Sequence, residues 1–124
     1  MGVKLSVIAE AIEGTVYTCK EYLENEVEYG FSSDLMSDVL TIDKEDVILI
    51  TGLNNIQTIR TAELAEIKYV IYARNKMINT DIIKLANENK ILVIQSPYSV
   101  FKVSGILYNL GVKPIYWWWY DFNI

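Results

Sequence analysis

Three continuous apolar runs of strand length stand out along the chain, at residues 47–50, 69–72 and 91–94. None of them alternates with polar residues, which is the pattern of strands in a parallel sheet whose two faces are both covered. A segment with the apolar spacing of a helix follows each run, at residues 55–66, 80–89 and 97–110. This alternation predicts right-handed crossovers and an α/β fold with a mostly parallel β-sheet, βα repeats and flanking helices.

Residues with helix-capping chemistry mark the ends of these helices. Asn54 or Asn55, Thr80 and Ser96 are the predicted N-caps, and Pro97 suits the first position of the last helix. Gly111 is predicted to end that helix.

The first third of the chain mixes helix and strand patterns. Residues 3–12 place apolar side chains on one helical face before Gly14, and residues 15–19 and 27–31 predict two strands joined by a polar turn. A further helix is expected from Ser32 or Ser33 as cap, with Asp34 in its first turn, where negative charge is favoured.

The length of 124 residues fits a single domain. We expect residues 1–111 to form the α/β domain and residues 112–124 to form an aromatic tail that packs on the domain or on a partner. The tail contains every tryptophan of the chain, and such side chains are enriched in binding interfaces. The predicted interface residues are Trp117, Trp118, Trp119, Tyr120 and Phe122.

A net charge of −5 with scattered Lys and Arg disfavours nucleic acid and anionic membranes as partners. No run approaches the ~20 apolar residues of a membrane span, and no signal peptide is expected at the N-terminus. The single cysteine, Cys19, indicates a reducing compartment, so we expect a cytoplasmic protein. A buried, inert thiol is favoured over a reactive one.

Catalytic and metal-binding chemistry is poorly represented. The chain has no histidine, so histidine-based triads are excluded, and no metal or cofactor is expected. Asp34 and Asp38 lie one helical turn apart and could hold a cation, but capping roles are favoured. Neither common phosphate-binding motif, GxxxxGK[ST] or GxGxxG, is present.

Polar residues follow each predicted parallel strand, at the edge where open α/β sheets bind ligands. Helix N-termini and Arg74, with Lys76, could form a site for a small anion there, although turns and caps are the more common role of such residues. The candidate ligand-binding residues are Ser32, Ser33, Asp34, Thr51, Gly52, Asn54, Asn55, Arg74, Asn75, Ser96 and Ser99.

Residues 29–40, with the run Ser-Asp-Leu-Met-Ser-Asp-Val, resemble the signature of DRTGG domains, and the segments 48–57, 85–94 and 96–101 are similar to that family in the same order. The resemblance covers roughly residues 5 to 111. It implies a fold similar to the N-terminal domains of HPr kinase and Mur ligases, and a regulatory, ligand-sensing or oligomerising role, often as a homodimer.

The chain departs from that family where many members carry Thr-Gly-Gly, since Ala73, Arg74 and Asn75 occupy those positions. Glycines there would allow positive φ or close approach of a ligand. Our first hypothesis is a non-catalytic, homodimeric regulatory domain that binds a small anionic metabolite or nucleotide. The alternative is a protein–protein interaction or scaffold module that uses the aromatic tail and has a degenerate ligand site.

Overall fold

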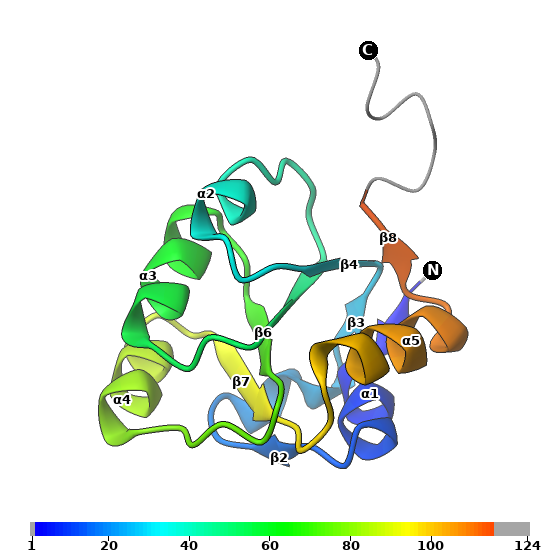
Figure 1. Cartoon of the computed structure of the whole chain (residues 1–124), viewed down its shortest axis with the longest axis horizontal. Helices are drawn as coiled ribbons and strands as arrows, with labels where there is room; N and C mark the ends of the chain where they lie inside the picture. Colours follow the sequence, from blue (N-terminus) through cyan, green and yellow to red (C-terminus); the bar gives the residue numbers. More distant parts are fainter. Residues whose placement is uncertain (1, 116–124) are drawn as a thin grey trace.

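The computed structural model describes residues 2–115, and its centre is a six-stranded sheet. The strand order is β2-β7-β6-β5-β4-β8, and helices cover both faces of the sheet (Figure 1). The strands are β2 (Thr15–Val16), β4 (Tyr29–Ser32), β5 (Val47–Thr51), β6 (Tyr69–Tyr72), β7 (Leu92–Gln95) and β8 (Lys113–Pro114). The short strands β1 (Val3–Lys4) and β3 (Glu26–Val27) form a separate antiparallel pair.

The sheet is parallel except at one edge. β4, β5, β6 and β7 pair in parallel with their neighbours, and β8 adds a parallel strand beside β4. At the opposite edge, β2 runs antiparallel to β7. The predicted α/β class with a mostly parallel sheet is therefore confirmed.

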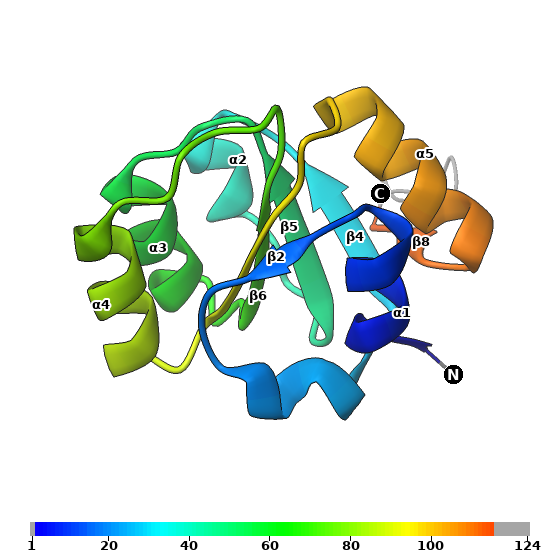
Figure 2. The ribbon, with the colours of Figure 1, turned by 90° about the horizontal axis from the view of Figure 1, so that it is seen from below.

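Alternate side chains of each strand point to opposite faces and form two cores. Ile48 and Ile50 of β5 pack with α1 (Leu5–Ala11) and α5 (Val100–Leu110). Val47 and Leu49 pack on the other face with α2 (Met36–Val39), α3 (Ile56–Leu64) and α4 (Thr80–Glu88). Figure 2 shows the sheet between α3 and α4 on one side and α1 and α5 on the other.

The N-terminal third differs from the sequence prediction. The first helix begins at Leu5 because Val3 and Lys4 pair with β3 instead. The predicted strand 15–19 ends at Val16, and its continuation is a 3₁₀ helix, η1 (Lys20–Glu24), preceded by Cys19 in the left-handed region at φ 52°. Thr18 replaces the missing backbone pairing, because its Oγ donates to the Ile91 carbonyl and accepts from the Val93 N–H.

Several predicted helix starts are also corrected. Asn55 caps α3 as predicted, by accepting from the Thr58 N–H at 3.2 Å. The cap of α4 is Asn79 rather than Thr80. Ser99, not Ser96, caps α5, so Pro97 lies in the preceding loop and outside the helix.

The helix after β4 likewise starts later than predicted. Ser32 belongs to β4, Ser33 accepts from the Leu35 N–H in a tight turn, and α2 begins only at Met36. Asp34 therefore lies before the helix rather than in its first turn. At the other end of the chain, Gly111 ends α5 with φ 108°, as predicted.

The sheet continues past the predicted end of the domain at residue 111. Lys113 and Pro114 form β8, while Val112 and Ile115 are buried in the cores on opposite faces. The first four residues of the predicted tail are thus part of the domain.

Candidate functional site

The loops after β4, β5, β6 and β7 lie along one edge of the sheet, which we call the carboxyl rim. They meet there because the four strands are parallel and adjacent. The sequence predicts that these loops lie together. Backbone hydrogen bonds join them, because the Ala73 N–H donates to the Thr51 carbonyl and the Ser96 N–H donates to the Tyr72 carbonyl. The rim is therefore a connected surface rather than four independent loops.

A single carboxylate joins the first two loops of the rim. Asp34 Oδ1 accepts from the Gly52 N–H at 2.7 Å and from Thr51 Oγ at 2.9 Å. Thr51 Oγ in turn accepts from the Leu53 N–H, which fixes the start of the loop after β5. Asp34 thus acts as an acceptor for a neighbouring loop, and not as the cap or dipole partner of α2 that the sequence suggested.

The side chain of Arg74 lies over Gly52. A Cβ atom added to Gly52 would stand 2.8 Å from Arg74 Cδ and 3.0 Å from Arg74 Nη1, with Asp34 Oδ2 at 3.5 Å. Any side chain at position 52 would displace the arginine side chain from this place. The ion pairs within residues 2–115 are Lys4–Glu24 and Lys113–Glu28, so the exposed Arg74 guanidinium has no paired carboxylate.

The backbone at Arg74 and Asn75 has the conformation that glycines would supply. Their φ angles are 67° and 55°, in the left-handed region. The Arg74 N–H donates to the Tyr98 carbonyl and the Asn75 N–H donates to the Ser96 carbonyl, which hold this turn against the loop after β7. Asn75 Oδ1 also accepts from Gln95 Nε2 at 3.0 Å. Arg74 and Asn75 therefore form a positive-φ turn of the kind that paired glycines would allow.

The remaining candidate residues have structural partners. Asn54 Nδ2 donates to the Met77 carbonyl, and Asn55 caps α3. Ser96 is buried and its Oγ donates to the Ile12 carbonyl, while Ser99 caps α5. Ser32 pairs with Ser104 of α5 at 2.6 Å. The structure thus gathers Asp34, Thr51, Gly52 and Arg74 closely and places the other candidates in caps and turns around them.

Sequence reasoning missed one group of side chains beside the rim. Lys102 Nζ lies 3.8 Å from the centroid of the Tyr98 ring, and the Tyr98 hydroxyl donates to the Glu13 carboxylate. That hydrogen bond, together with burial, raises the pKa of Tyr98. The spacing of Tyr98 and Lys102 by four residues in the predicted helix 97–110 was the available signal, although in the structure Tyr98 lies in the loop before α5.

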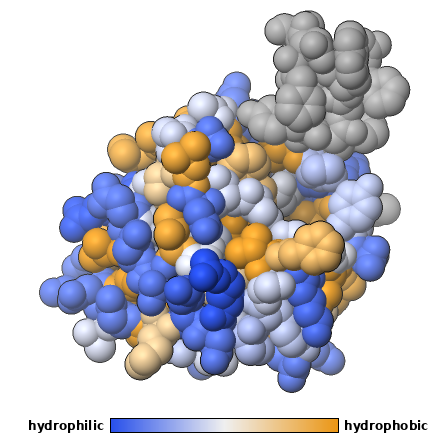
Figure 3. Space-filling model, viewed as in Figure 1, coloured by the Kyte–Doolittle hydropathy of each residue, from blue (hydrophilic) through white to orange (hydrophobic). Residues whose placement is uncertain are grey.

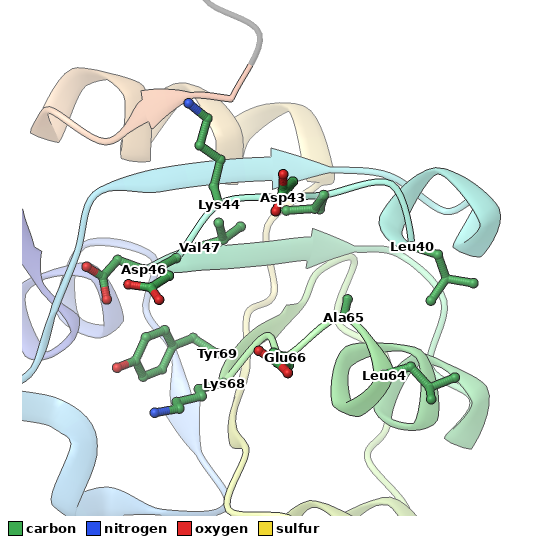
Figure 4. Close-up of a pocket in the computed structure, with 12 residues that line it drawn as sticks. Leu40, Asp43, Lys44, Asp46, Val47, Leu64, Ala65, Glu66, Lys68 and Tyr69 are labelled. Carbon is green, nitrogen blue, oxygen red and sulfur yellow. The ribbon is translucent and has the colours of Figure 1, made fainter.

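A hollow in the described residues lies away from the rim. It has a volume of about 580 Å³ and opens at the amino ends of β5 and β6. Figure 4 shows it between the loop that carries Asp43 and Asp46 and the end of α3 at Leu64. Four acidic residues line it against two lysines, and the Lys44 ammonium lies 5.2 Å from the Tyr29 ring. This charge balance does not suit an anion.

Other chemistry in the described part of the chain is sparse. No three His, Cys, Asp or Glu side chains gather there as ligands for a metal ion. Cys19 is half-buried, and burial, followed by the charge of Glu21, raises the pKa of its thiol, which lowers the thiolate fraction.

Each helix within residues 2–115 falls short of the length and hydrophobicity that a membrane span requires. The predicted interface residues 117–120 and 122 lie outside the described residues.

The match to a family model places this chain among known proteins. The model of the DRTGG domain matches residues 7–110, and the chain belongs to that family. No curated protein matches the sequence.

A solved structure with a similar fold is the CBS and DRTGG regulatory region of Clostridium perfringens pyrophosphatase, in complex with its activator diadenosine tetraphosphate. The TM-score is 0.72 at 17% sequence identity, over 91% of this chain. The chain spans about half of that structure, 48% of its length. At this identity the likeness establishes the fold.

Proposed function

We propose that this chain is a non-catalytic regulatory domain that binds a small anionic metabolite or a nucleotide at the carboxyl rim. The observation that carries the proposal is the unpaired, exposed guanidinium of Arg74, held over Gly52. An arginine fork recognises phosphate or carboxylate oxygens with two parallel hydrogen bonds. The contacts of Arg74 with Gly52 leave the charge at the edge where ligands bind in open parallel sheets.

The surroundings of Arg74 favour an anion. Helices α3 and α5 start beside this rim, and the positive ends of their dipoles favour negative charge. The nearby Asp34 carboxylate opposes this, but its Oδ1 already accepts two hydrogen bonds from Thr51 and Gly52. Lys76 in the same loop and Lys102 on α5 add further positive charge.

Nucleotides are the first ligands to test. The regulatory region of similar fold was solved with diadenosine tetraphosphate, a ligand that combines phosphates and adenine rings. A regulatory role without catalysis is supported by membership of the DRTGG family and by the absence of histidine from the whole chain. We place the protein in the cytoplasm, in agreement with its single cysteine.

The test is a thermal-shift titration with diadenosine tetraphosphate, ATP, AMP and inorganic pyrophosphate. A ligand that binds only the folded state raises Tm in proportion to the logarithm of its concentration above Kd. We expect at least one phosphate compound to raise Tm, and Arg74→Gln to abolish the shift. Arg60→Gln is the matched control, because it removes the same charge from the exposed face of α3. Equal loss in both variants, or no shift with any compound, would contradict the proposal.

A homodimer and a protein-interaction role form the second candidate. The observation in its favour is exposed aromatic surface on α5, where Phe101 is 89% and Tyr108 is 66% exposed. On the face shown in Figure 3, the apolar side chains among the coloured residues lie in several small groups between hydrophilic ones. Light scattering should give twice the chain mass, and Phe101→Glu should reduce it to the monomer if α5 forms the interface.

A further inference from the structure

An apolar groove lies at the β8 edge of the sheet and shares no lining residue with the acidic hollow of Figure 4. It is bounded by β4, α5 and β8 and has a volume of about 260 Å³. Phe31, Ile50, Leu107, Pro114 and Ile115 give it an apolar wall, and Tyr108 stands on the α5 side. Lys113 is the single charged residue of the lining, and its ammonium pairs with Glu28 at 3.4 Å. We call this feature the edge groove.

We propose that the edge groove binds the C-terminal segment of the same chain, residues 116–124. This segment contains Trp117, Trp118 and Trp119 together with two tyrosines and Phe122, and Asp121 is its single charged side chain. Each aromatic side chain removes on the order of 150–250 Å² from water when it is buried. A mainly apolar groove and an aromatic segment are therefore complementary in chemistry.

The position of β8 directs the segment to the groove. β8 runs parallel to β4, with Lys113 opposite Tyr29 and Pro114 opposite Gly30. The next residues of β4 in that direction are Phe31 and Ser32, and both line the groove. Ile115, the last residue before the segment, lines it as well. Nine residues span up to about 30 Å when extended, so the segment can reach every wall of the groove.

The far end of the groove offers an acceptor for an indole N–H. Ser104 Oγ donates its hydrogen to the Val100 carbonyl at 2.7 Å. In the hydrogen bond between Ser32 and Ser104, the Ser32 hydroxyl is therefore the donor and Ser104 Oγ the acceptor. Both lone pairs of Ser32 Oγ are then available to accept a hydrogen bond. A buried tryptophan requires such a partner for its N–H, which distinguishes this site from a purely apolar patch.

The same chain is the favoured source of the segment. A directly connected segment has an effective concentration in the millimolar range. A second copy at micromolar concentration supplies the segment at a level roughly a thousandfold lower, and each groove would need to release its own tail before accepting another.

The tryptophans of the chain all lie in this segment, so their fluorescence reports its environment directly. In the full-length protein we expect emission at shorter wavelength than in the urea-unfolded chain, and acrylamide quenching reduced several-fold. Tyr108→Glu and Ser32→Glu, which place charge on opposite walls of the groove, should each move emission and quenching toward the unfolded values. Leu64→Glu is the control, because it puts the same charge on an exposed leucine at the end of α3. Far-UV circular dichroism verifies that each variant is folded.

Three results would overturn the proposal. The wild-type tryptophans could be quenched as easily as those of the unfolded chain, or the Leu64→Glu control could show the same change as the groove variants. Protection that disappears on dilution from 50 to about 0.5 μM, a range in which dimers typically dissociate, would place the segment on a second copy instead. Neither fluorescence nor quenching depends on the ligand proposed for the carboxyl rim.

Discussion

Arg74 carries the guanidinium that we propose as an anion ligand, and its backbone has a conformation that disfavours any residue with a Cβ atom. At φ 67°, a residue with a Cβ atom is strained by about 1 kcal/mol relative to glycine. The hydrogen bond from its N–H to the Tyr98 carbonyl stabilises this conformation. An arginine therefore occupies a position whose backbone suits glycine.

This strain predicts an inverted order of stability for two substitutions. Arg74→Gly should be more stable than Arg74→Ala by about 0.5–1 kcal/mol, because both remove the side chain but only alanine keeps the Cβ atom at positive φ. At Arg60, within α3, the order should reverse by a similar amount because glycine weakens a helix. Urea unfolding of the four variants measures both differences. Alanine superior at both positions would contradict the geometry of the turn.

Tyr72 predicts a loss of stability in alkaline solution. Its side chain is fully buried, and burial raises the pKa of its hydroxyl well above the usual value of 10. The folded state then holds a proton that the unfolded chain releases, so the free energy of unfolding is complete below pH 10 and falls as the pH rises further. Tyr72→Phe removes this contribution and should flatten the decline. Urea unfolding between pH 8 and about 11, which brackets the ordinary tyrosine pKa, compares the two proteins, and parallel curves would assign the decline to other tyrosines.

At the scale of elements, the observed cap of α4, Asn79, and the predicted cap, Thr80, should differ in their contribution to stability. Asn79 Oδ1 accepts from the Ile82 N–H at 2.9 Å, whereas Thr80 is already the first helical residue. Asn79→Ala should lower the free energy of unfolding by about 1 kcal/mol, and Thr80→Ala should change it by a few tenths at most. Chemical denaturation measures both. A larger loss for Thr80→Ala would show that the helix starts one residue later.

The central strands could be predicted from the sequence because helices cover both faces of the sheet, so nearly every residue of these strands is apolar. Residues 47–50, 69–72 and 91–94 read as apolar runs, and they form β5, β6 and most of β7. The short elements could be predicted only in part: β1 was not predicted, and β2 covers only the start of the predicted strand 15–19, because both strands depend on partners far along the chain. β2 consists of two residues that pair with Ile94 and Gln95. Such pairing leaves no periodic signal in two residues.

The position of the carboxyl rim could be predicted from the sequence, but the contacts of its side chains could not. Parallel strands bring their ends together, so the meeting of the loops followed from the alternation of elements. The acceptor role of Asp34 did not follow, because Ser33 delays the start of α2 and turns the carboxylate toward Gly52. Likewise, Ser96 and Ser99 both have capping chemistry, and the residues between them gave no sign that Ser99 would cap α5.

For the whole molecule, the end of the domain is defined by β8. Val112 and Ile115 are both 4% exposed and belong to different cores, so each face of the sheet loses one side chain without them. A chain that ends at Gly111 should be less stable than one that ends at Ile115 by about 3–6 kcal/mol, from the burial of two aliphatic side chains. Thermal unfolding followed by circular dichroism compares them. Equal midpoints of thermal unfolding for the two chains would show that the domain ends at residue 111.

The hydrogen bond from Ser96 to the Ile12 carbonyl joins residues 84 positions apart in a buried setting. β2 pairs with β7 and Thr18 donates to the Ile91 carbonyl, so this segment also depends on partners far along the chain. Contacts of such high sequence separation slow folding, since a long loop must close before they form. The contacts that hold the N-terminal segment on the sheet are therefore expected to form late in folding, after β7 has taken its place.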